Sequence, residues 1–294
     1  MPTATRISRA RADRLRPHLE ALAASPPSGP DPIDYVHRYT SSDDREVAAI
    51  IAACLAFGRV ASFAGTLDAL FVLADAAGGP AAWTTAALTA DDPGLEPLFY
   101  RWVRGPDLQR LVRTIGRFRA KHGSLAGFMA EAIQSSDQDV GPGLEQLVDT
   151  LRALALEPSE HGFEALPRGF RHLLPHPKTG SACKRLCMLA RWMTRSSAPD
   201  LAMWSASPSQ LIIPLDTHVH KVAKLLGLTR RNDGSWRTAL EITQNLGRID
   251  PQDPVRFDFA LAHLGISGAC KGRRIKSICE PCALRPVCKV GGIG

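Results

Sequence analysis

The stretch LIIPLDTHVHKVAKLLGL, residues 211–228, carries both kinds of secondary-structure signal that the chain contains. Its first five residues, 211–215, form the only short β-branched run in the sequence, which is a strand signal. From Asp216 onward, apolar residues recur every three or four positions, which is the period of an amphipathic helix. Asp216 is a favourable N-cap residue, and Gly227 stands where a C-cap glycine belongs. The stretch therefore predicts a helix over 217–226 that begins at a carboxylate.

Helical periodicity dominates the rest of the chain. The run SSDDREVAAIIAACLAFG, residues 41–58, predicts a helix with Ser41 or Ser42 as its N-cap and acidic residues in its first turn. The same period predicts further helices over 62–76, 106–121, 124–134, 144–155, 181–195, 235–246 and 253–264. We therefore expect an all-α fold in which the two terminal segments join as one lobe and the central helices form another.

The composition is that of a globular protein, with 294 residues of which 45% are apolar and 22% charged. A formal net charge of +7 suits a polyanion partner, and equally a basic protein that is merely soluble. The longest apolar run, 47–58, is too short to span a bilayer. The arginine-rich N-terminus lacks the apolar core of a secretory signal; an amphipathic helix is the favoured interpretation and a transit peptide the alternative. Seven unevenly spread cysteines argue against a secreted disulfide framework, so we expect a cytoplasmic protein without a membrane partner.

Four of the seven cysteines are concentrated near the C-terminus, with spacers of eight, two and five residues. They are Cys270, Cys279, Cys282 and Cys288. Thiolates are soft ligands, so the cluster predicts a four-thiolate site for zinc or an iron–sulfur cluster, with four free buried thiols as the alternative. Zinc ribbons usually present two Cys-x2-Cys pairs and this segment has one, which favours the iron–sulfur cluster. The first spacer also carries four basic residues, Lys271, Arg273, Arg274 and Lys276.

A helix that runs into G-x-x-x-x-C, followed by C-x2-C-x5-C near the chain end, resembles the iron–sulfur loop of endonuclease III-type DNA glycosylases. The resemblance implies a 4Fe-4S cluster on the four cysteines. It also implies that the basic residues of the first spacer neutralise DNA phosphates. In that family the first spacer usually has six residues, whereas here it has eight. A solvated basic loop is the alternative interpretation.

The motif P-L-D-T-H-V-x-K-V, residues 214–222, resembles the V-D-T-H-V-x-R-V signature of the same superfamily, whose aspartate is its essential acidic residue. The resemblance implies that Asp216 stabilises positive charge at the sugar C1′ as the glycosidic bond breaks, and positions or deprotonates the attacking group. Orphan N–H groups and the dipole at a helix N-terminus favour the anionic carboxylate there. Helix capping alone is the alternative role. His218 and His220 lie on different helix faces, so we expect no shared metal site.

In that superfamily a helix-hairpin-helix precedes the aspartate, and the amides of its glycine-rich hairpin grip a phosphate. The corresponding segment here, LPHPKTG at 174–180, keeps only the final glycine, so the helix-hairpin-helix is degenerate. Gly180 and Ser181 are the implied DNA contacts. Ala182 occupies the position that carries lysine in bifunctional members, and Lys184 follows two residues later.

Lys184 is the candidate nucleophile, an amine that would attack C1′ and form a Schiff base. The alternative is a basic stripe that faces DNA or solvent, because Arg191 and Arg195 each fall within about 20° of Lys184 on a helical wheel. The long connection from Lys184 to Asp216 resembles that of archaeal 8-oxoguanine glycosylases, which makes an oxidised purine the first candidate lesion. Trp192 and Trp204 are candidates for stacking on a flipped base, with core packing as the alternative.

The chain is also similar to a family of uncharacterised bacterial proteins of unknown function. The matching stretches are GSACKRLCMLARWMTR, LIIPLDTHVHKVAKLLGLT, ALEITQNL, DPVRFDFALAHLGISGAC and DDREVAAIIAACLAFGRV. At the end of the last stretch, residues 57–59 would either wedge into a DNA duplex or simply end a core helix.

Together these patterns predict a two-lobed, DNA-glycosylase-like helical fold. The expected parts are a basic N-terminal arm or helix at 1–30, a helical lobe at 31–134, a helix-hairpin-helix-like catalytic region at 135–265 and an iron–sulfur cluster loop at 266–294. The expected function is a DNA glycosylase that flips and excises a damaged base, with or without AP-lyase activity. The alternative is a non-catalytic iron–sulfur protein that binds DNA or RNA. The expected partner is double-stranded DNA with a damaged base, bound by a nucleoid-associated monomer.

Overall fold

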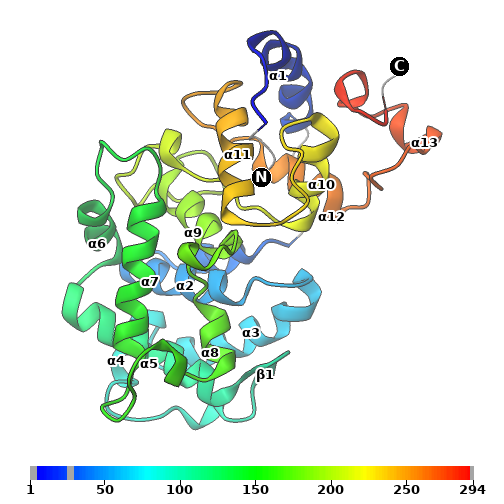
Figure 1. Cartoon of the computed structure of the whole chain (residues 1–294). Coiled ribbons are helices and arrows are strands. Elements are labelled where there is room, and N and C mark those ends of the chain that lie inside the picture. The colour runs from blue at the N-terminus through cyan, green and yellow to red at the C-terminus, as the bar shows by residue number, and fades with distance from the viewer. Residues whose placement is uncertain (1–4, 25–29, 292–294) are drawn as a thin grey trace. The chain divides into compact units, whose positions relative to one another are not determined.

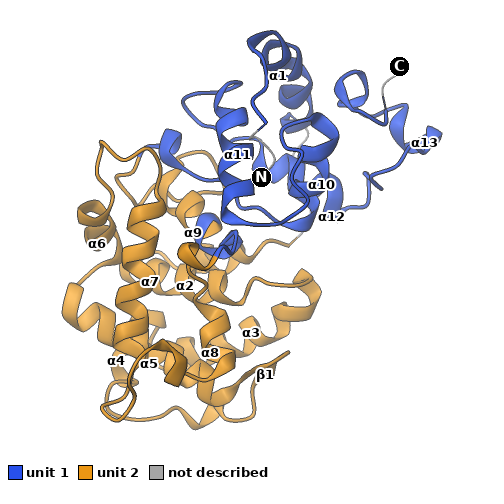
Figure 2. Cartoon of the chain, viewed as in Figure 1, with its two compact units in different colours: residues 1–29, 180–187, 207–294 blue, residues 30–179, 188–206 orange. Residues whose placement is uncertain are grey.

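The computed structural model describes residues 5–24 and 30–291, and these residues are mostly helical (Figure 1). The all-α prediction is therefore confirmed. The chain divides into two compact units, each built from separated segments (Figure 2). Unit 1 comprises Met1–Gly29, Gly180–Cys187 and Ser207–Gly294, and unit 2 comprises Pro30–Thr179 and Met188–Ala206. The expectation that the terminal segments share one lobe agrees with the composition of unit 1.

Unit 2 holds most of the central helices. Its α-helices are α2 (Ser42–Leu55), α3 (Val60–Ala76), α4 (Pro80–Ala86), α5 (Gly105–His122), α6 (Leu125–Ala132), α7 (Gly141–Ala155) and α8 (Arg168–Leu173). Its short 3-10 helices are η1 (Pro32–Arg38), η2 (Pro93–Leu95), η3 (Phe163–Ala165) and η4 (Pro177–Thr179). Strands β1 (Phe99–Tyr100) and β2 (Val103–Arg104) pair antiparallel as one hairpin.

The core of unit 2 forms where α5 packs against α4 and α7, and α2 against η1. Ser41 caps α2 by accepting a hydrogen bond from the Asp44 N–H, as the sequence predicted. Gly116 lets α5 approach α4, because a Cβ at this position would lie 2.1 Å from the carbonyl oxygen of Thr84. Burial of large aromatic side chains such as Phe118 then supplies hydrophobic stabilisation.

Unit 1 contains α1 (Arg9–Ala23), α10 (Thr217–Leu226), α11 (Trp236–Gly247), α12 (Asp258–Ile266), α13 (Lys276–Cys279) and the 3-10 helices η5 (Pro208–Gln210) and η6 (Arg285–Val287). Helix α10 packs on α12, and α1 packs on α12 and η6. The buried Asn245 side chain joins three segments: it accepts from the Ile7 N–H and donates to the carbonyls of Thr5 and Leu228. Helix α9 (Lys184–Thr194) begins in unit 1 and continues in unit 2.

The strand signal at 211–215 does not produce a strand. These five residues form a buried, irregular segment, and the Ile213 N–H donates to the hydroxyl of Thr243 rather than to a neighbouring strand. Pro214 has no N–H to offer a ladder. The strands form instead at 99–104, in a hairpin that the sequence did not predict.

Several predicted boundaries differ from those observed. The helix predicted over 181–195 begins at Lys184, because Gly180 and Cys183 adopt positive φ angles of 83° and 46°. The helix predicted over 253–264 begins at Asp258. The compact units also do not follow the predicted divisions after residues 134 and 265, since α5 and α6 both pack on α7 and keep 30–179 together.

Within the described residues, no helix is by itself both long and apolar enough to cross a bilayer. Helices α3 and α4 reach the required length and hydropathy only as a pair, which is bent by 78°.

Candidate functional site

Asp216 precedes α10 and caps it. Its Oδ1 accepts hydrogen bonds from the backbone N–H groups of His218 at 2.8 Å and Val219 at 2.7 Å, as the sequence predicted. The helix ends at Gly227, whose φ of 77° and ψ of 20° are left-handed, again as predicted. Asp216 itself is half-buried. Both described hydrogen bonds to this carboxylate end on Oδ1, which leaves Oδ2 for a substrate group or water.

The two histidines of this helix contact different segments. His218 lies against α12, where a Cβ at Gly265 would stand 2.5 Å from the Cβ of His218. The Nε2 of His220 lies 3.0 Å from the carbonyl oxygen of Arg231. The prediction that they do not share a site is therefore consistent with their positions.

The segment around Gly180 is anchored to the start of α11. The Gly180 carbonyl accepts from the Trp236 N–H at 3.1 Å, and Ser181 forms an antiparallel bridge with Ser235. Gly180 is exposed and Ser181 half-buried. Lys184, which is half-buried, is the first residue of α9. Compact unit 1 thus contains Gly180, Ser181, Lys184 and Asp216.

The predicted exposed basic stripe on α9 is wrong for Arg191. This side chain is buried, at 4% exposure, with Nη2 3.4 Å from Oδ1 of Asp200. Arg195 donates from Nη1 to Oδ2 of the same carboxylate at 2.7 Å. Burial raises the pKa of Asp200, although both guanidinium groups act to lower it. Arg191 therefore compensates a buried acid within unit 2 and is not a surface contact for DNA.

Trp192 and Trp204 are both buried, at 0% and 5% exposure. Their burial supports core packing, which was the alternative interpretation, and neither ring is exposed for stacking on a base. No sequence pattern pointed to Asp200, since its approach to α9 depends on how 196–203 folds back.

The thiol-rich loop follows α12. Its four cysteines are Cys270, Cys279, Cys282 and Cys288, and all are free thiols and half-buried. Burial raises the pKa of the Cys282 thiol, a hydrogen bond from the Leu284 N–H lowers it, and the other three thiols raise it further. The three therefore lie near enough to Cys282 to act on it electrostatically. The four basic residues of the first spacer, Lys271, Arg273, Arg274 and Lys276, are all exposed.

The thiol-rich loop has the donor atoms of a metal centre but not the geometry of one. Cys282 and the three thiols that act on it have the donor chemistry of a thiolate-bound iron–sulfur cluster or zinc ion. Across residues 5–24 and 30–291, however, the structure gathers no three His, Cys, Asp or Glu side chains as ligands of one metal ion. The donor set fits the group, but the sulfurs are not arranged as a coordination shell.

Helix α1 holds this loop from the other end of the chain. Arg11 donates from Nη2 to the carbonyl of Val287 at 2.6 Å and to that of Leu226 at 3.1 Å. Arg14 donates to the carbonyl of Pro286 at 2.9 Å, and Nδ1 of His18 lies 2.9 Å from that of Ala283. The basic N-terminal helix therefore binds the backbone of the loop, a contact between distant segments that no local pattern predicts.

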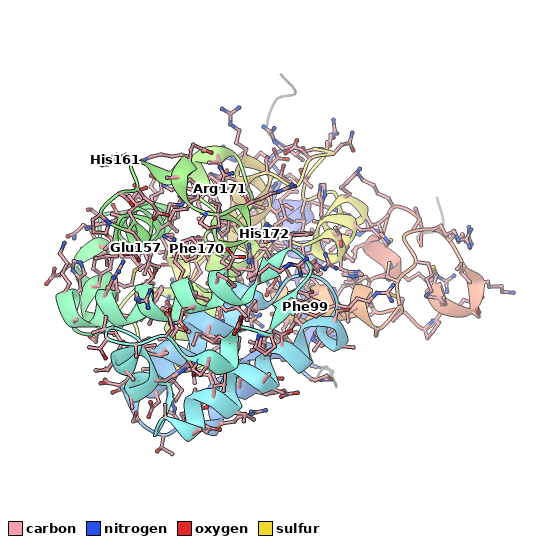
Figure 3. All side chains as sticks on the ribbon, turned by 90° about the horizontal axis from the view of Figure 1, so that it is seen from below. Phe99, Glu157, His161, Phe170, Arg171 and His172 are labelled. Atoms are coloured by element: carbon pink, nitrogen blue, oxygen red, sulfur yellow. The ribbon has the colours of Figure 1, made fainter. Side chains whose placement is uncertain are left out.

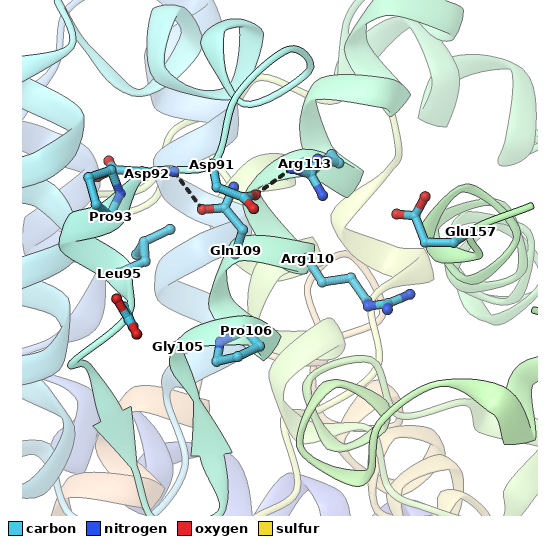
Figure 4. Close-up of a pocket in the computed structure, with 11 residues that line it drawn as sticks. Asp91, Asp92, Pro93, Leu95, Gly105, Pro106, Gln109, Arg110, Arg113 and Glu157 are labelled. Atoms are coloured by element: carbon cyan, nitrogen blue, oxygen red, sulfur yellow. Dashed lines mark hydrogen bonds and ion pairs between the residues drawn. The ribbon is translucent and has the colours of Figure 1, made fainter.

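Unit 2 contains a pocket of about 520 Å³ that no predicted site residue lines (Figure 4). Of its two arginines, Arg113 pairs with Asp91 of the lining, and Arg110 pairs with Glu160, which lies outside the lining, at 2.6 Å. The Asp92 N–H is bonded to the Gln109 side chain at 2.8 Å. The lining has more carboxylates than arginines, so this pocket does not favour an anionic substrate such as a nucleic acid.

The comparisons give a family rather than an activity. No curated protein and no solved structure matches the chain. A family model described as a protein of unknown function matches residues 31–267, which include Lys184 and Asp216 but neither α1 nor the cysteines of the loop. Since this match covers well over half of the chain, the protein belongs to the DUF2400 family.

Proposed function

We propose that this protein is a DNA glycosylase that excises a damaged base, with an oxidised purine as the first candidate lesion. The observation that carries the proposal is the composition of unit 1. One compact unit contains the carboxylate at the N-terminus of α10, the Gly180–Lys184 segment and the exposed basic loop 271–276. These are an acid, an amine and a phosphate-binding surface, the three groups that the reaction needs.

In the proposed reaction, the extruded nucleotide lies with its C1′ near Asp216. As the bond from C1′ to the base breaks, its electrons leave with the base, and the Oδ2 of Asp216 stabilises the positive charge that develops on the sugar. The Lys184 amine then attacks C1′ and loses a proton, and ring opening gives the Schiff base of a bifunctional enzyme. If water attacks instead, Asp216 accepts its proton and the enzyme is monofunctional.

The four thiols would hold a 4Fe-4S cluster, or zinc as the alternative, and its contribution would be to fix the shape of the basic loop. Lys271, Arg273, Arg274 and Lys276 repel one another, so a short loop that carries them needs such a constraint to present them together. Loss of the metal should then weaken DNA binding before it alters the surroundings of Asp216.

A second candidate is a non-catalytic nucleic-acid-binding protein of the same fold. Ala182 occupies the lysine position of bifunctional glycosylases, and an alanine side chain has no amine. It is also buried, at 7% exposure. The carbonyl oxygen of Gly180 accepts a hydrogen bond from the Trp236 N–H. These two observations favour a protein that kept binding and lost chemistry.

The deciding experiment is a panel of duplexes with single lesions, incubated with the wild type and with Asp216→Asn. Asparagine caps helices as well as aspartate does, so the variant should fold normally while losing the negative charge. Asp31→Asn, which alters the capping carboxylate of η1 in unit 2, is the matched control and should release bases at the wild-type rate. Release of no lesion by the wild type, or equal release by Asp216→Asn, would exclude the glycosylase and leave the binding protein.

A further inference from the structure

The hairpin of unit 2 exposes two aromatic rings. Phe99 is 66% exposed and Trp102 is 43% exposed, and they are the only exposed Phe, Tyr or Trp side chains in the described ranges. Figure 3 shows this region from below, with Phe99, Arg171 and His172 labelled. Exposed aromatic rings are costly in water and mark binding surfaces when they occur together.

The turn of this hairpin is built from unusual residues. Two-residue hairpin turns that need positive φ normally use Gly or Asn, but here the turn is Arg101-Trp102 and Arg101 has a φ of 55°. A non-glycine residue in this conformation is strained, and such strain is typical of sites kept for function. The turn therefore uses these residues for their side chains and not for the ease of their backbone conformation.

The exposed indole is held in place by its neighbours. The ring of Trp102 stacks on Phe57 with centroids 5.7 Å apart and meets the edge of His172 at 4.8 Å. Below the hairpin, the buried Asp107 carboxylate accepts from the N–H groups of Arg104 and Phe170, both at 2.9 Å, which ties β2 to α8. A platform fixed in this way loses little side-chain entropy when a ligand binds.

Trp102 also lines a pocket of about 300 Å³, together with Phe163, Arg168, Arg171 and His172. This volume lies at the lower end of the range for ligand pockets, large enough for a single base. The pocket lining has no carboxylate, in contrast to the acid-rich pocket of Figure 4. Arg171 pairs with Glu164 outside the lining, whereas Arg168 is exposed. The lining is therefore aromatic and cationic, which suits a flat ring attached to an anion.

The surface continues beyond the pocket. Phe99 pairs across the hairpin with Arg104, whose guanidinium carbon lies 5.5 Å from the Phe99 ring centroid. Arg101 lies 5.9 Å from the centroid of Trp102. Two aromatic platforms, each accompanied by an arginine, match two successive nucleotides of a strand better than one free nucleotide.

We propose that the hairpin 99–104 and the pocket lined by Trp102 bind unpaired nucleotides of single-stranded DNA. The bases stack on Trp102 and Phe99, and arginines, Arg168 foremost, neutralise the phosphates. We choose DNA over RNA because the lining has no Asp, Glu, Asn or Gln side chain to accept a hydrogen bond from a 2′-hydroxyl. This site uses neither Asp216 nor the thiols, so it goes beyond the proposed glycosylase and does not depend on it.

The test is the affinity of the full-length protein for a fluorescent, lesion-free oligothymidylate of about ten nucleotides, measured by anisotropy. Trp102→Ala should weaken binding about tenfold, while Trp102→Phe should retain most of the affinity. Arg168→Gln removes an exposed charge without disturbing packing, and should reduce the slope of log affinity against log salt by about 0.7. Leu88→Ala and Lys121→Gln, an exposed apolar and an exposed basic residue of the same unit, should bind as the wild type does.

Three outcomes would overturn the proposal. The first is unchanged affinity and salt dependence in both Trp102→Ala and Arg168→Gln. The second is a loss of affinity in Trp102→Ala that is as large for the matching oligouridylate or for duplex DNA as for the oligothymidylate, and the third is thymidine monophosphate bound as tightly as the oligomer. Because the probe carries no lesion, failure here leaves base excision by unit 1 untouched, and failure of the excision assay leaves this proposal untouched.

Discussion

Arg11 donates a hydrogen bond to the carbonyl oxygen of Val287, the residue immediately before Cys288, across almost the whole length of the chain. The same guanidinium bonds Leu226 at the end of α10. One side chain from α1 thus connects the thiol-rich loop with the helix that Asp216 caps. Charge-assisted bonds of this kind are stronger than neutral ones.

Replacing Arg11 with Ala should destabilise unit 1 and loosen the loop. Two carbonyl oxygens lose a charged donor, which should lower the free energy of unfolding by about 2 kcal/mol, measured by urea denaturation. The thiol of Cys288 should also react faster with a maleimide. Arg9→Ala removes an exposed arginine from the same helix and should change neither quantity. Equal effects in the two variants would mean that helix propensity and not the loop contact is responsible.

If Lys184 is the nucleophile, Lys184→Gln should abolish borohydride trapping of the protein on DNA. Glutamine keeps much of the length of the side chain and its helix propensity but cannot form a Schiff base. Lys221→Gln, an exposed lysine of α10, is the control and should be trapped as efficiently as the wild type. Trapping that persists in Lys184→Gln would assign the amine elsewhere and leave Lys184 as a phosphate contact.

Gly180 should contribute to stability through its backbone conformation and not through close packing. Its φ is 83°, yet a Cβ would meet no atom within 4 Å, so Gly180→Ala should cost about 1 kcal/mol without any clash. Gly234 has equally open space and no positive φ, so Gly234→Ala should be neutral or stabilise by about 0.5 kcal/mol. Thermal denaturation of both variants measures these changes in stability. An equal loss of stability in Gly180→Ala and Gly234→Ala would contradict the prediction.

Glu46 should make stability fall as the pH rises. Its carboxylate accepts from the N–H groups of Leu125 and Ala126, but burial raises its pKa above the value of 4.5 for a free glutamic acid. The folded state then binds a proton more readily than the unfolded state. The stabilisation is fully present below about pH 4.5 and is lost as the pH rises through the raised pKa of the folded state.

The measurement is urea denaturation of the wild type and of Glu46→Gln, from about pH 4.5 upward through the raised pKa of Glu46. Glutamine does not titrate, so the stability of the wild type relative to the variant should decrease with rising pH. Glutamine also satisfies only one of the two N–H groups, a cost of about 1 kcal/mol that does not vary with pH. Glu131→Gln, an exposed glutamate of the same unit, should show a constant difference. A constant difference for Glu46→Gln as well would refute the linkage.

If the loop carries a 4Fe-4S cluster, freshly purified protein should be brown and contain iron and sulfide in equal amounts. Cys282→Ser should lose the colour and both elements, and should bind duplex DNA more weakly. Cys54→Ala, which alters a buried cysteine of α2, should keep them. Zinc without sulfide would select the alternative metal, and wild-type protein without either metal would exclude the centre.

The features that could be predicted from the sequence are those set by near neighbours in the chain. The capping of α10 depends on Asp216, two N–H groups within three residues, and Gly227, so the pattern determined both ends. Ser41 at the start of α2 follows the same logic. The periodicity of apolar residues likewise located most of the longer helices, although it missed the short α4 and α8.

What could not be predicted depends on distant partners or on exceptions to residue preference. Arg191 has the spacing of an exposed stripe, but Asp200 folds back onto it and buries both. The run 211–215 has strand propensity but no partner strand, so tertiary packing overrides it. The hairpin was missed because Arg101 adopts a conformation for which sequence patterns expect Gly or Asn.

The hydrogen bond between Arg11 and Val287 can form only after both segments have been synthesised. Helix α1 is synthesised before unit 2, yet its partners in α12 and η6 are synthesised after unit 2. Unit 2 is complete once residue 206 is available, so it can fold while the rest of unit 1 is still being made. The basic, amphipathic α1 therefore lacks these two native partners until unit 2 has been synthesised, and we expect chaperones to protect it during that interval.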